Sequence, residues 1–373
     1  VAERLGSRLR GTDRVARFGG DEFVVLLRPM PSRETALSIA HQIVGVIEAP
    51  IDLHGRSISI SPSIGISVFP SDGQSGEELI QHADTAMYLA KAQGRAGVEF
   101  FRPSMAANAY AELVLESQLS TAIERKEFVL HFQPQVKASD GSLTGVEALI
   151  RWNHPERGLL GPNEFIGLAE QRRLMVPIGQ WVLREAVRLS AFWHESGLLD
   201  VPVAVNLTTM QFKRADFVAS IAEVLQAAQP ISAKGGALLE LELTERMLVD
   251  DVPNAIDTLS ELKALGLQIS VDDFGTGMTS LAHLTQWPID KLKIDRSFVE
   301  NLPQDQGAAA IARAIIQMAQ GLNLRVIAEG VQSAAQRELL VAWGCDELQG
   351  MDISPPLPRS AFESWVRLRQ GKR

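Results

Sequence analysis

Apolar and polar positions follow two different rhythms along the 373-residue chain. In the first hundred residues, short apolar runs at 23–27 and at two places within 57–69 predict strands. Apolar residues recur at helical spacing over 36–47, and a second helix is predicted from Ser75 to just before Gly94. This part of the pattern predicts a small α+β unit.

A regular strand and helix alternation follows a polar, Ala-rich stretch at 101–124 that is typical of a connecting helix. Eight strand-like runs occur at 128–132, 145–152, 201–207, 238–244, 268–273, 291–295, 325–329 and 347–349, most of them followed by amphipathic helical segments such as 178–193, 217–228, 255–265 and 308–322. Eight such units over about 250 residues predict an α/β fold of the (β/α)8 TIM-like barrel type, with a doubly wound open sheet as the competitor. We therefore expect domains at 1–102 and 125–373, joined by a connecting helix at 103–124.

Composition and charge narrow the range of partners. The 36 Lys and Arg against 45 Asp and Glu leave a formal charge of −9, which argues against a protein that grips polymeric nucleic acid. No run approaches the roughly eighteen apolar residues of a membrane-spanning helix, so no membrane contact is expected and a cytoplasmic location is predicted. The chain begins with Val1 and not Met, as a fragment would, so a longer, membrane-anchored parent protein stays open. The single Cys345 excludes an intramolecular disulfide.

Polar and charged residues stand at the ends of the predicted barrel strands. A barrel gathers strand ends at one face, so we expect the following side chains to converge: Glu147, Asn206, Glu242, Glu245, Asp272, Asp273, Lys293, Asp295, Glu329 and Gln349. Any one acid there is more often a helix cap, but several close carboxylates repel by about 4 kcal/mol per pair and need cations or protons. Carboxylates and an amide suit Mg²⁺ or Mn²⁺, and a pair of such ions suits a phosphoryl displacement in which Lys293 would orient a water or neutralise developing charge.

Seven separated motifs in this region closely resemble the EAL phosphodiesterases. In chain order they are Glu147-Ala148-Leu149-Ile150-Arg151-Trp152, Asn206-Leu207-Thr208, Glu242-Leu243-Thr244-Glu245, Asp272-Asp273-Phe274-Gly275-Thr276-Gly277, Lys291-Leu292-Lys293-Ile294-Asp295, Ala328-Glu329-Gly330-Val331 and Gly344-Cys345-Asp346 through Gln349-Gly350. The resemblance extends from 128 to about 358 and implies a barrel that hydrolyses cyclic di-GMP to linear 5′-pGpG with two Mg²⁺ or Mn²⁺ ions. It also implies a homodimer formed through the barrel.

The resemblance assigns a role to each site residue. Metal ligands would be Glu147, Asn206, Glu242, Asp272, Asp273 and Glu329, with Asp272 bridging the ions. Lys293 would position the attacking water, Glu329 is a candidate general base, and Glu245 would brace the loop after Asp273. Substrate contacts would come from Gln133, Arg151, Asp295 and Gln349.

The first domain carries a second signature. Gly19, Gly20, Asp21 and Glu22 resemble the signature hairpin of GGDEF diguanylate cyclases, and later pieces at 63–66, 83–88 and 91–95 follow in that family's order. Arg10 and Asp13 match its inhibitory cyclic di-GMP site, for which a solvated ion pair is the alternative. Because that family begins with a further strand that carries a metal-binding aspartate, we expect this part to be truncated and inactive as a cyclase. GTP binding at this part and regulation of the barrel through 101–124 remain a hypothesis.

One alternative for the whole chain is a receptor that binds cyclic di-GMP without cleaving it. Three departures from the EAL pattern keep that alternative open, because Gln332, Met278 and Met351 replace a glutamate, a tyrosine and an aromatic residue. None of the three belongs to the implied metal ligands. The complete ligand set favours the enzyme.

Overall fold

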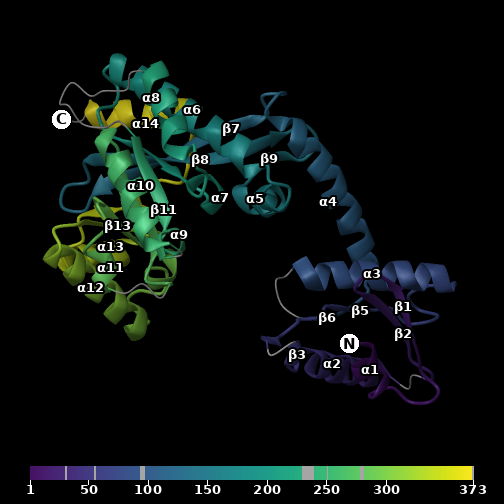
Figure 1. Cartoon of the computed structure of the whole chain (residues 1–373). Helices are drawn as coiled ribbons and strands as arrows, with labels where there is room; N and C mark the ends of the chain where they lie inside the picture. Colours follow the sequence, from purple (N-terminus) through teal and green to yellow (C-terminus); the bar gives the residue numbers. More distant parts are fainter. Residues whose placement is uncertain are drawn as a thin grey trace. The chain divides into compact units, whose positions relative to one another are not determined.

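The structure divides into two compact units, Val1–Ser117 and Gln118–Arg373. It is a computed structural model that describes residues 1–29, 32–53, 56–92, 97–228, 239–249, 251–277 and 281–371. Helix α4 (Pro103–Ala122) occupies the stretch predicted to be a connecting helix, and the boundary between the units falls within it (Figure 1). Among the described residues, the first unit contains three two-stranded sheets and the second unit contains one ten-stranded sheet.

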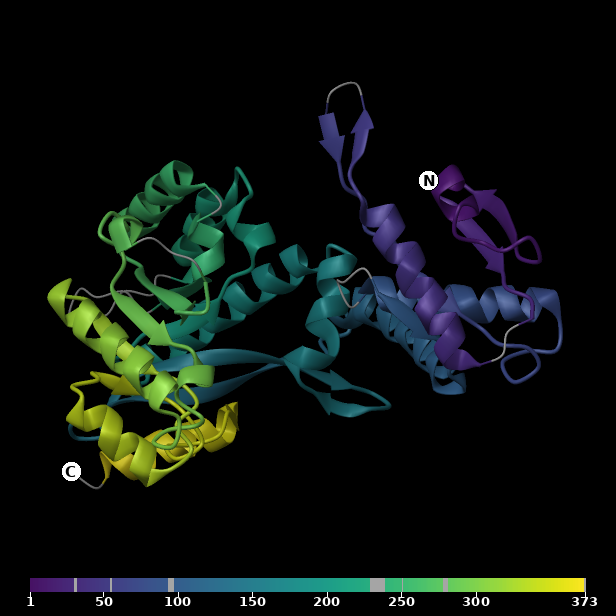
Figure 2. The same ribbon diagram turned by 90° about the horizontal axis from the view of Figure 1, so that it is seen from below.

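In the first unit, short strands lie between two helices, as the α+β prediction requires (Figure 1). A Cβ atom at Gly65 would lie 1.9 Å from the carbonyl oxygen of Ala83, so only glycine allows strand β5 to pack this closely on helix α3. The hairpin β3–β4 extends beyond the end of α2 (Figure 2). The elements of this unit are α1 (Ala2–Gly6), β1 (Arg14–Gly19), β2 (Glu22–Leu26), α2 (Arg33–Glu48), β3 (Ile51–Leu53), β4 (Arg56–Ile58), β5 (Ile64–Ile66), α3 (Gly76–Ala92) and β6 (Val98–Phe100).

The second unit is a closed barrel, which confirms the predicted fold class. Its eight ring strands follow the order β7, β15, β14, β13, β12, β11, β10, β8 and back to β7. Their bounds are β7 (Phe128–Lys137), β8 (Leu143–His154), β10 (Val203–Asn206), β11 (Leu239–Thr244), β12 (Gln268–Phe274), β13 (Lys291–Ile294), β14 (Arg325–Ala328) and β15 (Glu347–Leu348). Strands β9 (Gly158–Leu160) and β16 (Leu357–Pro358) flank the ring.

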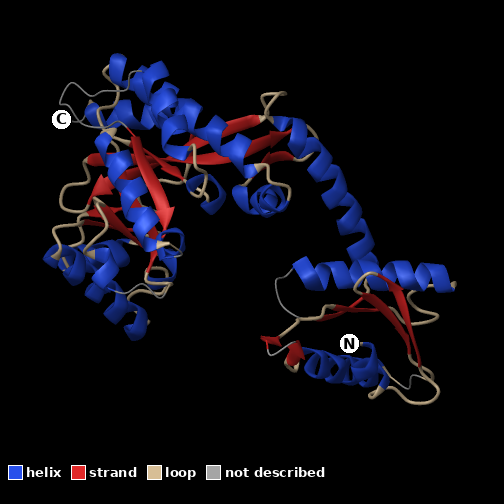
Figure 3. Cartoon of the chain, viewed as in Figure 1, coloured by secondary structure: helices blue, strands red, loops and turns tan. Residues whose placement is uncertain are grey.

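Helices surround these strands on the outside (Figure 3). The longer ones are α5 (Pro162–Gln171), α6 (Met175–Glu195), α8 (Phe217–Ala228), α10 (Val252–Ala264), α12 (Gln306–Gly321), α13 (Ala334–Ala342) and α14 (Arg359–Gln370). Single turns are α7 (Thr209–Phe212), α9 (Glu245–Val249), α11 (Leu281–Leu284) and the 3₁₀ turn η1 (Arg296–Phe298). All four residues of β13 are buried, because helices cover one face of the strand and the barrel interior covers the other.

One strand departs from the parallel pattern of a regular (β/α)8 barrel. Strand β7 pairs antiparallel with both of its ring neighbours, β8 and β15. The turn between β7 and β8 spans only 138–142, and Gly141 there has φ 69°. Parallel strands need a longer crossover, so this short turn makes β7 and β8 a hairpin.

Within the described residues, no helix is both long enough and apolar enough to cross a bilayer.

Candidate active site

A single buried lysine lies among the carboxylates at the barrel centre. The Nζ atom of Lys293 is 2.6 Å from Glu242 Oε2 and 2.6 Å from Glu329 Oε1. The same atom is 3.4 Å from Asp272 Oδ1 and 4.0 Å from Glu147 Oε2. Lys293 is 1% exposed. Four acids from four different strands therefore share one ammonium group.

The parallel strands explain why residues so distant in sequence meet. Glu147 lies on β8, Glu242 on β11 and Asp272 on β12, and these strands end on the same side of the barrel. Glu329 directly follows β14, and its N–H donates to the carbonyl oxygen of Ile294 at 3.2 Å. The structure thus brings together the strand-end residues that the sequence singled out.

Burial perturbs the acids of this cluster strongly. It raises the pKa of Glu329 to about 8, in spite of the nearby ammonium of Lys293. Burial and then the charge of Glu147 raise the pKa of Glu242 well above its ordinary value. Burial alone would lower the pKa of Lys293, but the surrounding carboxylates outweigh it and hold that pKa well above the usual range. The lysine is therefore charged, and the cluster retains protons near neutral pH.

Two carboxamides hold the carboxylate of Glu147. Asn206 Nδ2 donates to Glu147 Oε1 at 2.6 Å, and Gln349 Nε2 donates to Glu147 Oε2. Gln349 Nε2 also donates to Gln133 Oε1 at 3.1 Å, and Gln133 Nε2 donates to the carbonyl oxygen of Ser354 at 3.1 Å. Burial would raise the pKa of Glu147, but the ammonium group and both amides outweigh it and lower that pKa. The carboxylate of Glu147 is thus held ionised.

A strained backbone position displays the second aspartate of the pair. Asp273 has φ 53°, in the left-handed region, at a register irregularity of β12 between Val271 and Phe274. Its N–H donates to Asp272 Oδ1 at 2.9 Å. Burial, followed by the charges of Asp272 and Asp295, raises the pKa of Asp273 to about 6. Asp295, predicted to contact substrate, therefore lies beside Asp273.

Glu245 contacts the loop that follows Asp273, as the resemblance implied. Its Oε2 accepts the N–H of Gly275 at 3.2 Å, and the residue is 4% exposed. A Cβ atom at Gly277 would lie 2.4 Å from Glu245 Oε1. Any residue other than glycine at 277 would therefore displace either this carboxylate or the loop.

The donor set fits hard divalent cations, although the acids now converge on an ammonium group. Both oxygens of Glu242 and Oε1 of Glu329 are buried without a hydrogen bond of good geometry. Within the stretches that the structure describes, no three His, Cys, Asp or Glu side chains form a ready-made metal cage. Carboxylate oxygens are nevertheless the ligands that Mg²⁺ and Mn²⁺ prefer. Such oxygens gain from the arrival of a cation.

A second charged layer lies deeper in the barrel, two residues earlier on the same strands. The strand-end pattern did not predict it. Lys291 Nζ is 3.0 Å from Glu240 Oε2 and 2.8 Å from Glu347 Oε2, and Glu347 Oε1 is 3.0 Å from Arg325 Nη1. Lys291 Nζ also donates to Gln135 Oε1 at 3.3 Å. Alternate residues of a strand share one face, so the pairs 240/242 and 291/293 were the available signal.

Comparison with known proteins identifies the family to which this barrel belongs. The model of the "EAL domain" matches residues 116–356, which is more than half of the chain. The chain belongs to the EAL domain family. The model of the "Diguanylate cyclase, GGDEF domain" matches residues 1–97.

Relatives with curated names include the bifunctional diguanylate cyclase/cyclic di-GMP phosphodiesterase MucR of Pseudomonas aeruginosa. It is 44% identical over 96% of this chain and 52% of its own length. The cyclic di-GMP phosphodiesterase PdeR of Escherichia coli is 37% identical over 95% of this chain and 52% of its own. This chain thus spans about half the length of these relatives.

Solved structures agree with the fold. The chain resembles "PaMucR Phosphodiesterase, c-di-GMP complex", at 42% identity over 66% of this chain and 98% of that chain, with a TM-score of 0.63. It also resembles the cGMP-bound form of the EAL enzyme Bd1971, at 34% identity over 70% of this chain and 71% of that chain, with a TM-score of 0.64.

The other residues singled out in the EAL part differ in their surroundings, where the structure describes them. Arg151, on β8, donates from Nη1 to the carbonyl oxygen of Ile150 at 2.8 Å. The N–H of Gln332 donates to Gln336 Oε1 at 2.7 Å. Met351 is 62% exposed, whereas Met278 lies outside the described residues.

In the GGDEF part, the signature residues form the exposed tip of the hairpin β1–β2. Gly19 pairs with Glu22, Gly20 has φ 48°, and Arg17 Nε donates to the carbonyl oxygen of Gly20 at 2.9 Å. Asp13 Oδ2 accepts the N–H of Arg10 at 2.8 Å, so these two predicted partners are joined through the backbone of Arg10. That hydrogen bond lowers the pKa of Asp13. Arg95, in the last GGDEF-like piece, lies outside the described residues.

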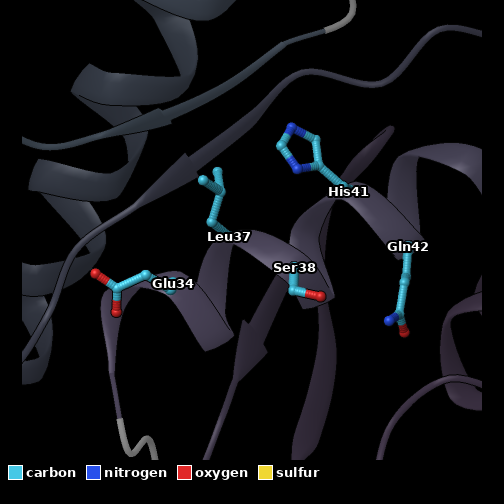
Figure 4. Close-up of a pocket in the computed structure, with 5 residues that line it drawn as sticks. All are labelled: Glu34, Leu37, Ser38, His41 and Gln42. Atoms are coloured by element: carbon cyan, nitrogen blue, oxygen red, sulfur yellow. The ribbon is translucent and has the colours of Figure 1, made fainter.

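A hollow of about 500 Å³ lies along α2 of the GGDEF part (Figure 4). Its lining residues, Glu34, Leu37, Ser38, His41 and Gln42, all come from that helix, and none of them belongs to either signature.

Proposed function

We propose that the EAL part hydrolyses cyclic di-GMP to linear 5′-pGpG with the help of two divalent cations, Mg²⁺ or Mn²⁺. The observation that carries this proposal is the convergence of Glu147, Glu242, Asp272 and Glu329 on one lysine at the barrel centre. The relatives named as cyclic di-GMP phosphodiesterases and the neighbour solved with c-di-GMP identify the substrate class.

The chain offers six donors for the cations: Glu147, Asn206, Glu242, Asp272, Asp273 and Glu329. When bound, the cations would neutralise the phosphate and lower the pKa of a bound water. Lys293 would orient the attacking water from its position among the acids. The water oxygen forms a bond to phosphorus, and the bond from phosphorus to the 3′ oxygen breaks. Glu329, 2.6 Å from Lys293, is the proposed acceptor of the water proton once the cations have displaced the proton that its raised pKa of about 8 retains at neutral pH.

Substrate orientation is proposed for residues around that centre. Gln133 and Gln349 present carboxamides beside Glu147, Arg151 contributes a guanidinium from the same strand, and Asp295 lies beside Asp273. Glu245 acts on the chemistry through the loop at Gly275.

The GGDEF part is proposed to be inactive as a cyclase and to regulate the barrel by binding GTP or cyclic di-GMP, the latter at Arg10 and Asp13. We assign residues 1–102 to this part, 103–124 to a connecting helix and 125–373 to the EAL barrel. Assembly as a homodimer through the barrel and a cytoplasmic location complete the proposal. Sedimentation analysis of the purified chain tests the dimer.

Turnover by the purified chain is the deciding experiment. With Mn²⁺ or Mg²⁺ added, cyclic di-GMP should be converted to pGpG. Chromatography of the nucleotides measures this conversion. Glu147→Ala should abolish most turnover because it removes a metal ligand, while Glu261→Ala, on the exposed side of α10, should leave turnover unchanged. Binding of cyclic di-GMP without cleavage by the wild-type chain would establish the receptor alternative instead.

A further inference from the structure

The carboxamide of Gln349 has a fixed direction, and the buried residues beneath it supply the reason. We propose that Lys291 and Gln135 are positioning residues that aim the NH₂ group of Gln349 at Glu147, and so hold this carboxylate ready for a cation. The inference rests on the proposed function, because it concerns the carboxylate assigned there to a metal.

Four side chains form a head-to-tail chain of hydrogen bonds through the barrel. Lys291 Nζ donates to Gln135 Oε1 at 3.3 Å, and Gln135 Nε2 donates to Gln349 Oε1 at 3.0 Å. Gln349 Nε2 then donates to Glu147 Oε2. Lys291 and Gln135 are 0% exposed, Gln349 is 3% exposed and Glu147 is 6% exposed. The chain thus runs from the deeper charged layer to the carboxylate.

The direction of this chain is fixed at both ends, because the ionised carboxylate of Glu147 at the upper end can only accept hydrogen bonds. An ammonium group can only donate hydrogen bonds, so it requires the oxygen of the Gln135 amide to face it. The nitrogen of that amide then faces Gln349 and requires an oxygen there in turn. The Gln349 NH₂ group is left to point at Glu147. Reversal of either amide would place two buried acceptors or two donors against each other, at a cost of about 1–3 kcal/mol.

Lys291 is itself held in place and charged. Its Nζ atom lies 3.0 Å from Glu240 Oε2 and 2.8 Å from Glu347 Oε2. Burial alone would lower the pKa of Lys291, but these two carboxylates outweigh it and raise that pKa. The lower end of the chain is therefore a permanent donor.

On the neighbouring strand β8, the absence of a side chain at Gly145 leaves room for the Gln135 amide. Gly145 pairs with Gln135 across β7 and β8, and a Cβ atom there would lie 2.6 Å from Gln135 Oε1. A methyl group at position 145 would therefore push the amide out of line without removing any polar group. This gives a second, independent way to break the chain.

The test measures Mn²⁺ binding to the metal-stripped, full-length chain by titration calorimetry. Gln135→Met keeps the side-chain volume but removes both hydrogen bonds, and should weaken Mn²⁺ binding about tenfold, near the lower end of what outer partners of metal ligands contribute. Gln268→Met is the matched control. Gln268 Oε1 accepts from Arg325 at 2.8 Å, so the control also removes a glutamine that hydrogen-bonds to a cation of the barrel. It should change Mn²⁺ affinity by less than about twofold.

Thermal melting of the metal-free variants separates positioning from general damage. If Gln135 had only a structural role, Gln135→Met and Gln268→Met would each lose Mn²⁺ affinity in proportion to the stability that they lose. That result would overturn the proposal. Gly145→Ala decides the matter if Gln135→Met fails to fold, because it should also weaken Mn²⁺ binding severalfold. Wild-type affinity in the folded variants would refute the positioning role alone. A wild-type chain that binds no Mn²⁺ would refute the metal site of the proposed function as well.

Discussion

Replacement of Lys293 by methionine removes the one ammonium group that four carboxylates share. Two of its charge contacts are 2.6 Å long, and the lysine and Glu242 are both 1% exposed. Two unit charges 4 Å apart interact by about 4 kcal/mol at an effective dielectric of 20. Loss of one partner of a buried pair costs about 3–5 kcal/mol, because it leaves an uncompensated buried charge, and the acids that remain relieve part of this cost by taking up protons. For a unit of this size the melting temperature should fall by about 10 °C.

Cations should reverse this loss. In thermal melts of metal-stripped Lys293→Met, added Mn²⁺ should recover most of the lost melting temperature, since the ion supplies the missing positive charge. Lower pH should recover part of it by protonating the acids. Lys291→Met is the comparison: it loses a similar buried ion pair with Glu240 and Glu347 and should be destabilised comparably, but Mn²⁺ should raise its melting temperature by less than that of Lys293→Met, because its lost positive charge lies away from the bound ion.

Two results would refute this reasoning. A metal-free Lys293→Met that melts within about 2 °C of the wild type would mean that the ammonium does not offset the repulsion among the acids. Equal rescue of both variants by Mn²⁺ would mean that the ion acts elsewhere on the protein. Turnover of cyclic di-GMP by Lys293→Met should in either case fall by at least about a hundredfold, because the group that orients the water is gone.

Three further predictions concern single residues and the first unit. Folding raises the pKa of Glu329 to about 8, so the folded chain keeps a proton that the unfolded chain releases above pH about 4.5. The free energy of unfolding of the metal-free protein should therefore fall from pH 5 to pH 8, by up to about 1.4 kcal/mol per pH unit. Glu329→Gln should flatten that dependence in urea titrations, and an unchanged slope would exclude Glu329 as its source. Gly350→Ala should lower the melting temperature by several degrees, because Gly350 has φ 155° and a Cβ atom there would lie 2.2 Å from the carbonyl oxygen of Val331; an unchanged melt would contradict the close approach. Incubation with GTP and Mg²⁺ should yield neither cyclic di-GMP nor its hydrolysis product pGpG, and formation of either would show that the GGDEF part is active.

Strand ends were the most predictable feature of this molecule. Parallel strands with buried faces give apolar runs, and the charged residue that stops each run must lie at the rim or be paired. For this reason Asn206, Glu242 and Asp272 could be grouped from the amino-acid sequence alone, whereas Glu147 lies inside β8 and was added as a charged residue of an earlier strand. The direction of β7 was less accessible, because an apolar run at 128–132 has the same pattern in a parallel or an antiparallel strand. Only the short turn at 138–142 carries that information.

Partners that depend on side-chain geometry were not predictable. Gln135 reads as one polar residue in a strand, and nothing in its neighbours along the chain indicates that it connects Lys291 with Gln349. The raised pKa of Asp273 likewise follows from burial and from the approach of Asp295 twenty-two residues later. Such effects arise from distances across the barrel, which a strand pattern does not contain.

The two charged layers of the barrel differ in their balance of charge, and this difference separates structure from function. In the deeper layer, Lys291 and Arg325 meet two carboxylates, Glu240 and Glu347, so cations and anions are equal. In the upper layer, the single ammonium of Lys293 meets four carboxylates. A barrel that needed buried charge only for packing would be expected to balance both layers, because an excess of buried charge costs free energy. The unbalanced layer is therefore the one that divalent cations would complete, with retained protons making up part of the deficit until they bind.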